Sequence, residues 1–454
     1  MCPGVGLAPG SPGAKLQVCP DISGEFLMFR TVTVLLMAAL LMVGCGAVAR
    51  SSRGYNVVMI VVDDLNTDIG CFGKPAVTPN IDELARKGTR FDRAYCQFPL
   101  CNPSRTSFLS GRRPETTGVL DNTTPPRIRL GRVEFLPEYF RRFGYFAGRV
   151  GKIEHTEFEE SGVIHWDVAR DAVEQDYDTT NPGHNAPSWG VSPNDDADEP
   201  DGQSARQFVE ILEQHKGRAF FLALGFLKPH RPFVAPKKYF DLYPLDSIAL
   251  PPGEGNSQLT DQEKREIIRA YRAAISFVDA QVGFVIQALR RLNLMDNTVI
   301  VFTSDHGLHV GEHDRFGKKQ SLQEGVARVP LVVVAPGAKE NQSTLALVEL
   351  VDLFPTLAEL CGLPAPEGVE GTSFVPLLDS PSRPWKAAAF TTNKESDGVS
   401  RSVRDRRYRY IEHDDGTQEL YDYETDPLEM INLAHERRSK RVKKELQRLL
   451  RHGA

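Results

Sequence analysis

Short apolar runs rich in β-branched residues alternate along the chain with stretches of helical periodicity. The runs at Tyr55–Asn66 and Asn297–Gly307 both change from apolar to acidic near their carboxyl ends. Two further runs, 218–230 and 329–336, have the length and composition of buried strands. Between them, residues 263–292 place apolar side chains at helical spacing. This alternation predicts an α/β fold with a large, mostly parallel sheet sandwiched by helices.

The pattern changes after about residue 384. Residues 401–413 and 418–429 predict antiparallel strands joined by an Asp-Asp-Gly-Thr turn, and a basic helix follows them. The apolar stripe of this helix consists of Val442, Leu446, Leu449 and Leu450. We interpret its basic face as solvated surface, with a dock for a polyanion as the alternative. We therefore expect a main domain at 55–383 and a smaller C-terminal α+β subdomain at 384–454.

A leader precedes these domains. From Met28 the chain has an early arginine, an apolar run and then small residues, which is typical of an export signal, and the run is short for a membrane span. Cleavage after Ala49 and lipid attachment at Cys45 both stay open. We expect residues 1–49 to be the leader, with translation starting at Met28. The mature protein is then periplasmic or extracellular, and it contacts a membrane only if it is a lipoprotein anchored at Cys45.

Composition limits the partners. A formal net charge of −6 leaves no basic excess to neutralise phosphates, which argues against a general nucleic-acid binder. After the leader only four of the seven cysteines remain, at 71, 96, 101 and 361, which is too few for a disulfide scaffold. A bridge between Cys96 and Cys101 and a specific chemical use for one cysteine both stay open.

Acidic residues follow two of the predicted strands. Asp63 and Asp64 come after the first strand, and Asp305 comes after a later one. Ligands of such sheets gather beyond the carboxyl ends of the strands, so these carboxylates are expected to converge on Ca²⁺ or Mg²⁺. The alternative for a single Asp-Asp pair is a capping role, and two matching motifs favour the metal site.

Residues 99–114 form a turn-rich stretch that contains Cys101. Pro103 fixes the backbone after the cysteine, and Arg105 offers a two-pronged donor suited to a tetrahedral oxyanion. Taken alone, Cys101 has two interpretations: a small buried apolar residue, or a residue with chemistry of its own.

The segment 101–114 resembles the signature of sulfatases of the formylglycine type, in which Cys-x-Pro-x-Arg marks the cysteine for oxidation to an aldehyde. Cys96 lacks the spaced proline and arginine. Further blocks similar to sulfatase sequences occur in the same order along nearly the whole chain after the leader, at 61–73, 78–97, 148–155, 226–233, 303–313 and 419–427. The resemblance implies an alkaline-phosphatase-like or sulfatase-like fold.

Within that family the chain resembles the iduronate-2-sulfatases. The features are His306 beside Asp305, the spacing from Lys152 to His155, and Lys318 after Gly-Glu-His-Asp-Arg-Phe-Gly. Arg112 and Arg113 could read a substrate carboxylate, and loop-fixing salt bridges are the alternative for them.

The resemblance implies a role for each catalytic residue. The aldehyde made from Cys101 is hydrated, and one hydroxyl attacks the sulfur of the ester. His230 and Lys318 assist the leaving oxygen, and His155 removes a proton from the second hydroxyl so that sulfate leaves.

The resemblance further implies that Arg105 and Lys152 hold the aldehyde hydrate and the sulfate oxygens. It implies one divalent ion, Ca²⁺, whose ligands are Asp63, Asp64, Cys101, Asp305 and His306. The imidazole of His306 is a departure because calcium prefers oxygen, and it either contacts the ion or orients Asp305. A formylglycine-generating enzyme is the implied maturation partner.

The expected function is therefore removal of sulfate from a sulfated saccharide, with 2-O-sulfated iduronate or a related uronate as the leading substrate. The loop 176–202 is expected to influence that choice. Two alternatives stay open. One is a phosphonate monoester or phosphodiester hydrolase of the same superfamily, and the other is a catalytically silent carbohydrate-binding protein in which Cys101 stays unmodified.

Overall fold

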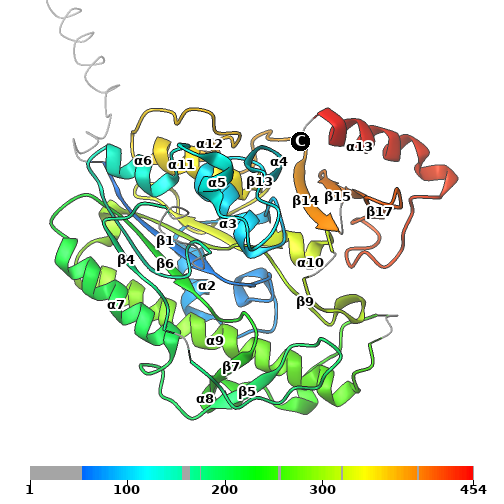
Figure 1. The fold of residues 1–454 in the computed structure, drawn as a ribbon, viewed down its shortest axis with the longest axis horizontal. Coiled ribbons are helices and arrows are strands. Elements are labelled where there is room, and N and C mark those ends of the chain that lie inside the picture. The colour runs from blue at the N-terminus through cyan, green and yellow to red at the C-terminus, as the bar shows by residue number, and fades with distance from the viewer. Residues whose placement is uncertain are drawn as a thin grey trace, which may run out of the picture. The chain divides into compact units, whose positions relative to one another are not determined.

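The computed structural model describes residues 54–155, 164–173, 175–253, 257–318, 321–395 and 398–452 (Figure 1). The predicted leader, residues 1–49 with its alternatives at Met28 and Cys45, lies outside the described residues. Its processing and the export of the protein therefore stay predictions.

A mixed sheet forms the centre of the fold. Its order is β11 (Arg328–Val329), β2 (Thr89–Tyr95), β12 (Leu331–Val334), β8 (Thr298–Ser304), β1 (Asn56–Val62), β6 (Phe220–Phe226), β3 (Phe146–Gly151) and β4 (Val168–Arg170), with β13 (Gln342–Glu349) paired to β2. The neighbours β8, β1, β6, β3 and β4 are parallel, whereas β12 runs antiparallel to both β8 and β2. The predicted mostly parallel sheet is confirmed, with an antiparallel strand that the apolar run at 329–336 did not reveal.

Both faces of the sheet are covered, which explains the continuous apolar sequence of β1. Alternate residues of β1 enter two cores: Val58 and Ile60 join one, and Val57 and Met59 join the other. The first core is completed by α2 (Pro79–Lys87), α7 (Pro200–His215) and α9 (Asp261–Arg291). The second is completed by α3 (Cys101–Ser110), α6 (Leu136–Arg142), α11 (Leu353–Leu360) and α12 (Val375–Asp379). Figure 1 shows α7 and α9 side by side below the sheet.

Helix α9 accounts for the helical periodicity predicted at 263–292. Thr260 caps its N-terminus, since the Thr260 side chain accepts from the Glu263 backbone and the Glu263 side chain accepts from the Thr260 backbone. The helix is long and apolar enough to cross a membrane, but 78% of its apolar window is buried inside the fold. It is therefore a core helix.

The C-terminal region has an antiparallel sheet of its own. The sheet comprises β14 (Ala389–Glu395), β15 (Gly398–Arg404), β16 (Tyr408–Glu412) and β17 (Gln418–Asp422). Helix α13 (Lys440–His452) buries Leu446 and Leu450 of its predicted apolar stripe in the small core beside this sheet. The predicted α+β character is confirmed, although the stretch 401–413 contains a turn and parts of two strands. The exact domain boundary at 384 stays a prediction.

The described fold also contains several short elements. They are α4 (Pro114–Thr117), α5 (Pro126–Leu130), β5 (Trp189–Ser192), β7 (Phe233–Pro236), α8 (Lys237–Phe240), β9 (His309–Val310), β10 (Phe316–Gly317) and α10 (Glu324–Ala327). Strand β5 pairs with β7, and β9 pairs with β10. The loop predicted at 176–202 therefore includes a strand, because the main chain around Trp189 forms ladder hydrogen bonds with a segment distant in sequence.

Candidate active site

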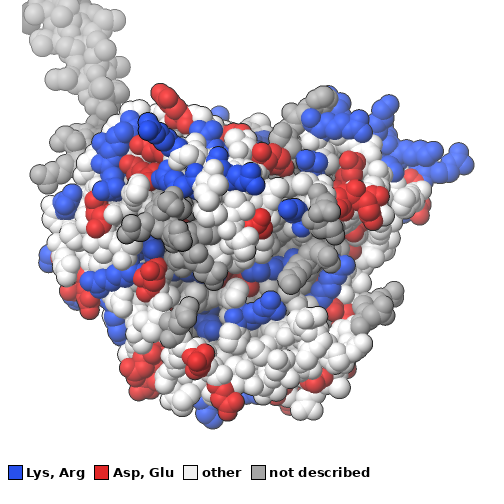
Figure 2. Space-filling view, in the orientation of Figure 1, with Lys and Arg blue, Asp and Glu red and all other residues white. Residues whose placement is uncertain are grey.

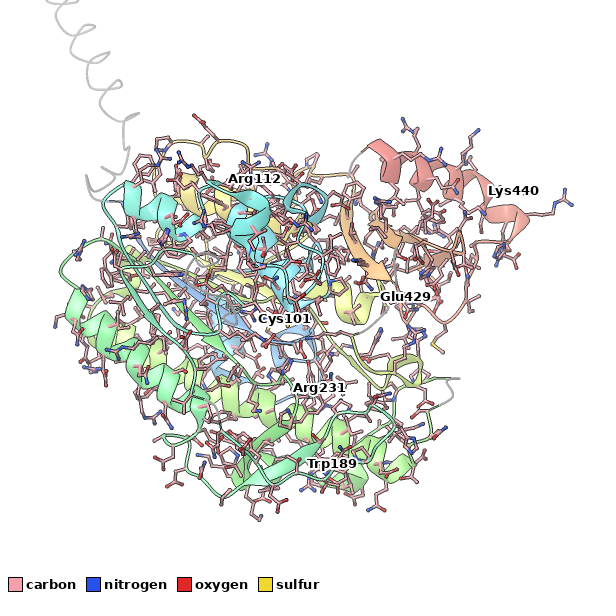
Figure 3. All side chains as sticks on the ribbon, viewed as in Figure 1. Cys101, Arg112, Trp189, Arg231, Glu429 and Lys440 are labelled. Carbon is pink, nitrogen blue, oxygen red and sulfur yellow. The ribbon has the colours of Figure 1, made fainter. Side chains whose placement is uncertain are left out.

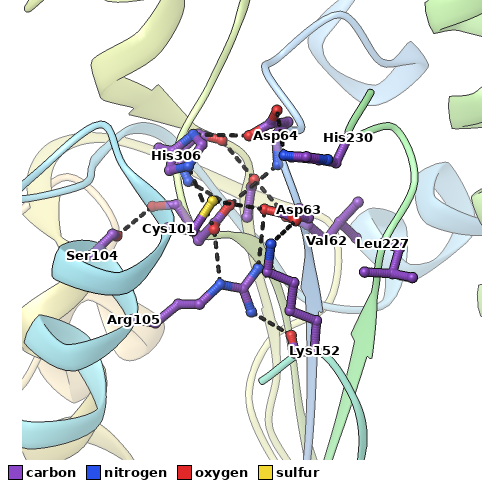
Figure 4. Close-up of polar contacts among 12 residues, drawn as sticks. Val62, Asp63, Asp64, Cys101, Ser104, Arg105, Lys152, Leu227, His230 and His306 are labelled. Atoms are coloured by element: carbon purple, nitrogen blue, oxygen red, sulfur yellow. Dashed lines mark hydrogen bonds and ion pairs between the residues drawn. The ribbon is translucent and has the colours of Figure 1, made fainter. Parts of the chain in front are cut away.

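The two acidic motifs meet at the edge of the sheet, as predicted. Strands β1 and β8 are parallel neighbours with Val62 opposite Ser304, so the residues that follow them lie together. The backbone N–H of Asp64 donates to Asp305 Oδ1 at 3.2 Å. Asp64 adopts a left-handed backbone conformation with φ of 63°, which turns the chain sharply after β1. Asp63, Asp64 and Asp305 are all buried. Figure 4 shows Asp63 and Asp64 at the centre of the polar contacts of this site.

Cys101 lies at the first residue of helix α3, where the sequence suggested only turns. Pro103 is tolerated there because a backbone N–H in the first helical turn has no intrahelical partner. Arg105 is one turn further along and turns toward the carboxylates, with its Nε 2.9 Å from Asp305 Oδ2. Cys101 Sγ is 3.5 Å from Asp63 Oδ1. The helix thus positions the thiol and the guanidinium against the same acidic group.

Two lysines complete the cluster. Lys152 follows β3, and its Nζ is 2.5 Å from Asp63 Oδ2. Lys318 follows β10, and its Nζ is 2.6 Å from Asp64 Oδ1 and 3.3 Å from Cys101 Sγ. Because removing charges from water is costly, the buried carboxylates need these cations.

Burial and the surrounding charges set the ionisation of the cluster. Burial opposes the charged form of Asp63, but the neighbouring cations, Lys152 foremost, outweigh it and hold the pKa of Asp63 well below its usual range. Burial also opposes the charged form of Lys318, and the Asp64 carboxylate outweighs it and raises the pKa of Lys318. Burial raises the pKa of the Cys101 thiol to about 12, with Asp63 adding to the rise. The unmodified thiol is therefore protonated at neutral pH, which makes it a weak nucleophile.

The three predicted histidines differ in their surroundings. His306 is fully buried, with Nε2 3.5 Å from Asp305 Oδ2 and Nδ1 3.4 Å from Asp64 Oδ1. His230 is one-third exposed, and its Nε2 is 4.0 Å from Asp64 Oδ2. His155 is half-buried three residues after Lys152, and its catalytic role stays a prediction.

The donor set fits a divalent cation. One group of side chains whose ligand atoms all lie within 4.8 Å of one another comprises Asp63, Cys101, Asp305 and His306, and a second comprises Asp64, Cys101 and His230. Carboxylate oxygens from three aspartates favour a hard ion such as Ca²⁺, and the imidazole of His306 is the softer member. These groups include every residue of the predicted ligand set.

A cavity of about 910 Å³ opens beside this cluster, and Asp64, His230 and Lys318 line it. Its wall also contains residues 184–187, and two arginines that the sequence did not single out as part of the site, Arg231 and Arg315. Residues 184–187 belong to the predicted specificity loop. Arg231 directly follows His230 in the Lys-Pro-His-Arg-Pro-Phe block. This position next to a predicted catalytic residue is the sequence feature that could have identified Arg231 as part of the site.

Arg113 belongs to a different charge cluster. Its guanidinium contacts both oxygens of the buried Glu349 carboxylate at 2.8 Å, and Lys386 Nζ lies 2.9 Å from the same carboxylate. The structure therefore supports a loop-fixing salt bridge for Arg113, and not recognition of a substrate carboxylate.

Comparison with known proteins agrees with the site. A family model described as Sulfatase matches residues 55–363, and one described as N-sulphoglucosamine sulphohydrolase, C-terminal, matches residues 311–453. A sulfatase of Formosa agariphila is 35% identical over 429 residues, covering 84% of this chain and 83% of that protein. The iduronate 2-sulfatase of Mus musculus is 34% identical over 388 residues, covering 70% of each chain.

Solved structures share the fold. The phosphonate monoester hydrolase of Agrobacterium radiobacter superposes with a TM-score of 0.78 at 22% identity, covering 87% of this chain and 94% of that chain. A 2-O GAG sulfatase superposes with a TM-score of 0.73 at 24% identity, covering 88% of this chain and 91% of that chain. The alkaline-phosphatase-like fold is thereby confirmed. With the family match over 55–363 and the Cys-x-Pro-x-Arg signature at the buried cluster, this chain belongs to the formylglycine-dependent sulfatase family.

Proposed function

We propose that this protein is an exported, calcium-dependent enzyme that removes sulfate from a sulfated saccharide through a formylglycine made from Cys101. The observation that carries the proposal is the position of Cys101. Its Sγ lies 3.3 Å from Lys318 Nζ and 3.5 Å from Asp63 Oδ1, within a cluster that borders the 910 Å³ cavity. A carbohydrate-binding protein without activity has no need to bury a cysteine among opposed charges at such a position.

The side chains divide the work by position. Lys318 and His230 line the cavity, where both assist the leaving oxygen. His155 then removes a proton from the second hydroxyl so that sulfate leaves. Lys152 pairs with Asp63, and Arg105 pairs with Asp305, and both cations hold the aldehyde hydrate and the sulfate oxygens. Oxidation of Cys101 to an aldehyde and addition of water to that aldehyde would supply a nucleophilic hydroxyl, and a cation held by the aspartates and His306 would supply a further positive charge beside it.

The substrate we propose is 2-O-sulfated iduronate or a related uronate in a saccharide. Two relatives named iduronate 2-sulfatase, from mouse and human, support this choice. A further relative, named choline-sulfatase, is 29% identical over 425 residues, so sulfate esters outside saccharides belong in the test.

Maturation and location complete the proposal. A formylglycine-generating enzyme would act on Cys101 before folding is complete, because the folded chain buries this residue. The segment from Met28 to Ala49 would direct export, ending in a free periplasmic or extracellular protein or in a lipoprotein anchored at Cys45.

The test measures sulfate release by protein co-expressed with a formylglycine-generating enzyme. The panel holds a disaccharide ending in 2-O-sulfated iduronate, a 6-O-sulfated hexose counterpart, choline sulfate, nitrophenyl sulfate and a nitrophenyl phosphodiester. Preference for the first substrate supports the full proposal. Faster hydrolysis of the phosphodiester than of every sulfate would instead favour the phosphonate and phosphodiester hydrolases of the same superfamily.

Variants make the test specific to residue 101. We expect Cys101→Ala to abolish sulfate release. The matched control is Cys96→Ala, which removes a buried thiol five residues earlier that lies outside the signature. Release that persists in Cys101→Ala would contradict the proposed role of this residue.

A further inference from the structure

Two exposed arginines stand in the wall of the active-site cavity. Arg231 and Arg315 line the same 910 Å³ space as His230 and Lys318. Within the described part of the chain, neither guanidinium has a carboxylate within ion-pair distance. In the view of Figure 3, Arg231 lies between Cys101 and Trp189 of β5. As far as the described residues go, both guanidinium groups can therefore donate to whatever occupies the cavity.

The acidic residues of the cavity wall are already neutralised. Asp64 is paired with Lys318 at 2.6 Å, and Asp314 is paired with Lys264 at 2.5 Å. The charge that remains on the wall is consequently positive, although the whole chain carries a formal net charge of −6. In Figure 2, blue Lys and Arg atoms gather in the middle of the face shown.

Two acidic residues near the arginines, Glu199 and Glu419, have other partners. Glu199, in the adjoining cavity that Arg231 also borders, accepts from the Tyr177 hydroxyl at 2.7 Å. Glu419, whose carboxylate feels the charge of Arg315, contacts His413 at 2.9 Å and accepts from the Tyr421 hydroxyl. Among the described residues, neither Glu199 nor Glu419 forms an ion pair with Arg231 or Arg315.

Backbone contacts position Arg231 near His230 and Arg315 near Lys318, and both neighbours line the cavity. The carbonyl of Arg231 lies 2.8 Å from His230 Nδ1. The β9–β10 hairpin holds Arg315 three residues before Lys318, since the Gly311 N–H donates to the Arg315 carbonyl at 2.8 Å. A guanidinium provides paired donors that match a carboxylate or a sulfate.

We propose that Arg231 and Arg315 recognise a second anionic group of the substrate, a carboxylate or another sulfate carried near the scissile sulfate. The inference rests on the proposed sulfatase function of the same site and narrows its substrate class to polyanionic saccharides. Sulfate esters that lack a second anion gain nothing from the two arginines.

The test compares Arg231→Gln and Arg315→Gln with the parent protein, both matured by a formylglycine-generating enzyme. The substrates are a disaccharide ending in 2-O-sulfated iduronate, a disulfated disaccharide without a carboxylate, and nitrophenyl sulfate. Because a hydrogen bond to a charged group is stronger than one between neutral groups, each variant should raise KM for a polyanionic substrate about tenfold or more. We expect kcat, and KM for nitrophenyl sulfate, to change less than about twofold by the same reasoning. The polyanion whose KM rises more identifies the group that is bound.

Arg448→Gln is the matched control, because Arg448 is an exposed arginine on α13 outside the cavity. Arg231→Lys should restore part of the lost affinity, since it keeps the charge without the paired donors. An unchanged KM for both polyanions would overturn the inference, and so would an equal loss on nitrophenyl sulfate. A parent protein that releases sulfate from no substrate would instead contradict the proposed function itself.

Discussion

Two of the buried charge clusters in the described part of the chain differ in their relation to the active-site cavity, and of these two the first borders it. In the active site, Asp63, Asp64 and Asp305 face cations, and Asp64 and Lys318 reach the cavity wall. The second cluster joins the central sheet region to the C-terminal sheet. There the fully buried Arg409 contacts Glu324 and, at 2.8 Å, Glu429.

The two clusters differ in whether their polar groups are all bonded within the protein or remain available to bind an ion or a substrate. Arg409 donates to Leu322 O and Ser402 Oγ besides its two carboxylates, so its donors are used within the protein. The active-site cluster instead combines close carboxylates, a cysteine and a histidine whose ligand atoms converge within 4.8 Å. A buried charge network alone therefore indicates structure, and a cavity together with converging ligand atoms indicates chemistry.

The largest expected effect separates chemistry from folding at residue 101. Cys101→Ala should reduce sulfate release to the background rate, a loss on the order of a thousandfold or more, because the nucleophile is gone. The unfolding midpoint in urea should stay close to that of the parent, since only one small side-chain atom is removed. A large loss of stability, with activity retained per folded molecule, would instead mean that Cys101 has a structural role like that of Arg409.

Removal of metal should affect the active-site cluster alone. Treatment with a chelator should abolish sulfate release and lower the thermal unfolding midpoint, and Ca²⁺ should restore both. Saturating Ca²⁺ at about one hundred times its Kd stabilises the folded state by about 2.7 kcal/mol. Asp305→Asn should lose this thermal response, whereas Asp296→Asn, at an exposed position, should keep it. A chain that unfolds at the same temperature with and without Ca²⁺ would contradict the metal assignment.

Breaking the second cluster, around Arg409, should lower the stability of the fold. Arg409→Met leaves the Glu324 and Glu429 carboxylates buried without their main partner, which should lower the free energy of unfolding by about 3–5 kcal/mol. Urea unfolding measures this change. Arg448→Met, at an exposed position on α13, should stay within about 0.5 kcal/mol of the parent.

Acid should weaken the ion pairs of this second cluster. Burial opposes the charged form of Glu324, but Arg409 and Arg404 outweigh it and lower the pKa of Glu324 to about 2. The unfolded chain, with an ordinary glutamate pKa, binds more protons, so this stabilisation is complete above about pH 4.5 and is lost as the pH falls toward 2. We expect Glu324→Gln to reduce that pH dependence by on the order of 1–3 kcal/mol, measured by urea unfolding across this range. Glu340→Gln, on the surface, is the control, and a matching slope in both variants would contradict the assignment.

The positions of the aspartates could be predicted from the sequence, because they depend on the pattern of apolar strands that end in acidic residues. Asp63 and Asp305 each end an apolar run, and parallel strands bring their carboxyl ends to one edge. The family signature then added Cys101, Lys152 and Lys318, which lie close to those aspartates in the structure.

Other features depended on packing between distant segments. The proline, serine and asparagine after Cys101 favour turns in isolation, yet all ten residues of α3 are buried, and tertiary packing makes them helical. Arg231 and Arg315 come from separate loops, and only the folded chain shows that they share one cavity. The same holds for Arg113, whose partner Glu349 is more than two hundred residues away.

The most direct test of the central claim is the rate of sulfate release as a function of the fraction of Cys101 converted to formylglycine. Preparations made with and without a formylglycine-generating enzyme can be mixed, and peptide mass spectrometry gives the converted fraction. The account predicts a rate proportional to that fraction, with a line through the origin. Equal rates at all fractions, or no sulfate release from fully converted protein, would contradict it.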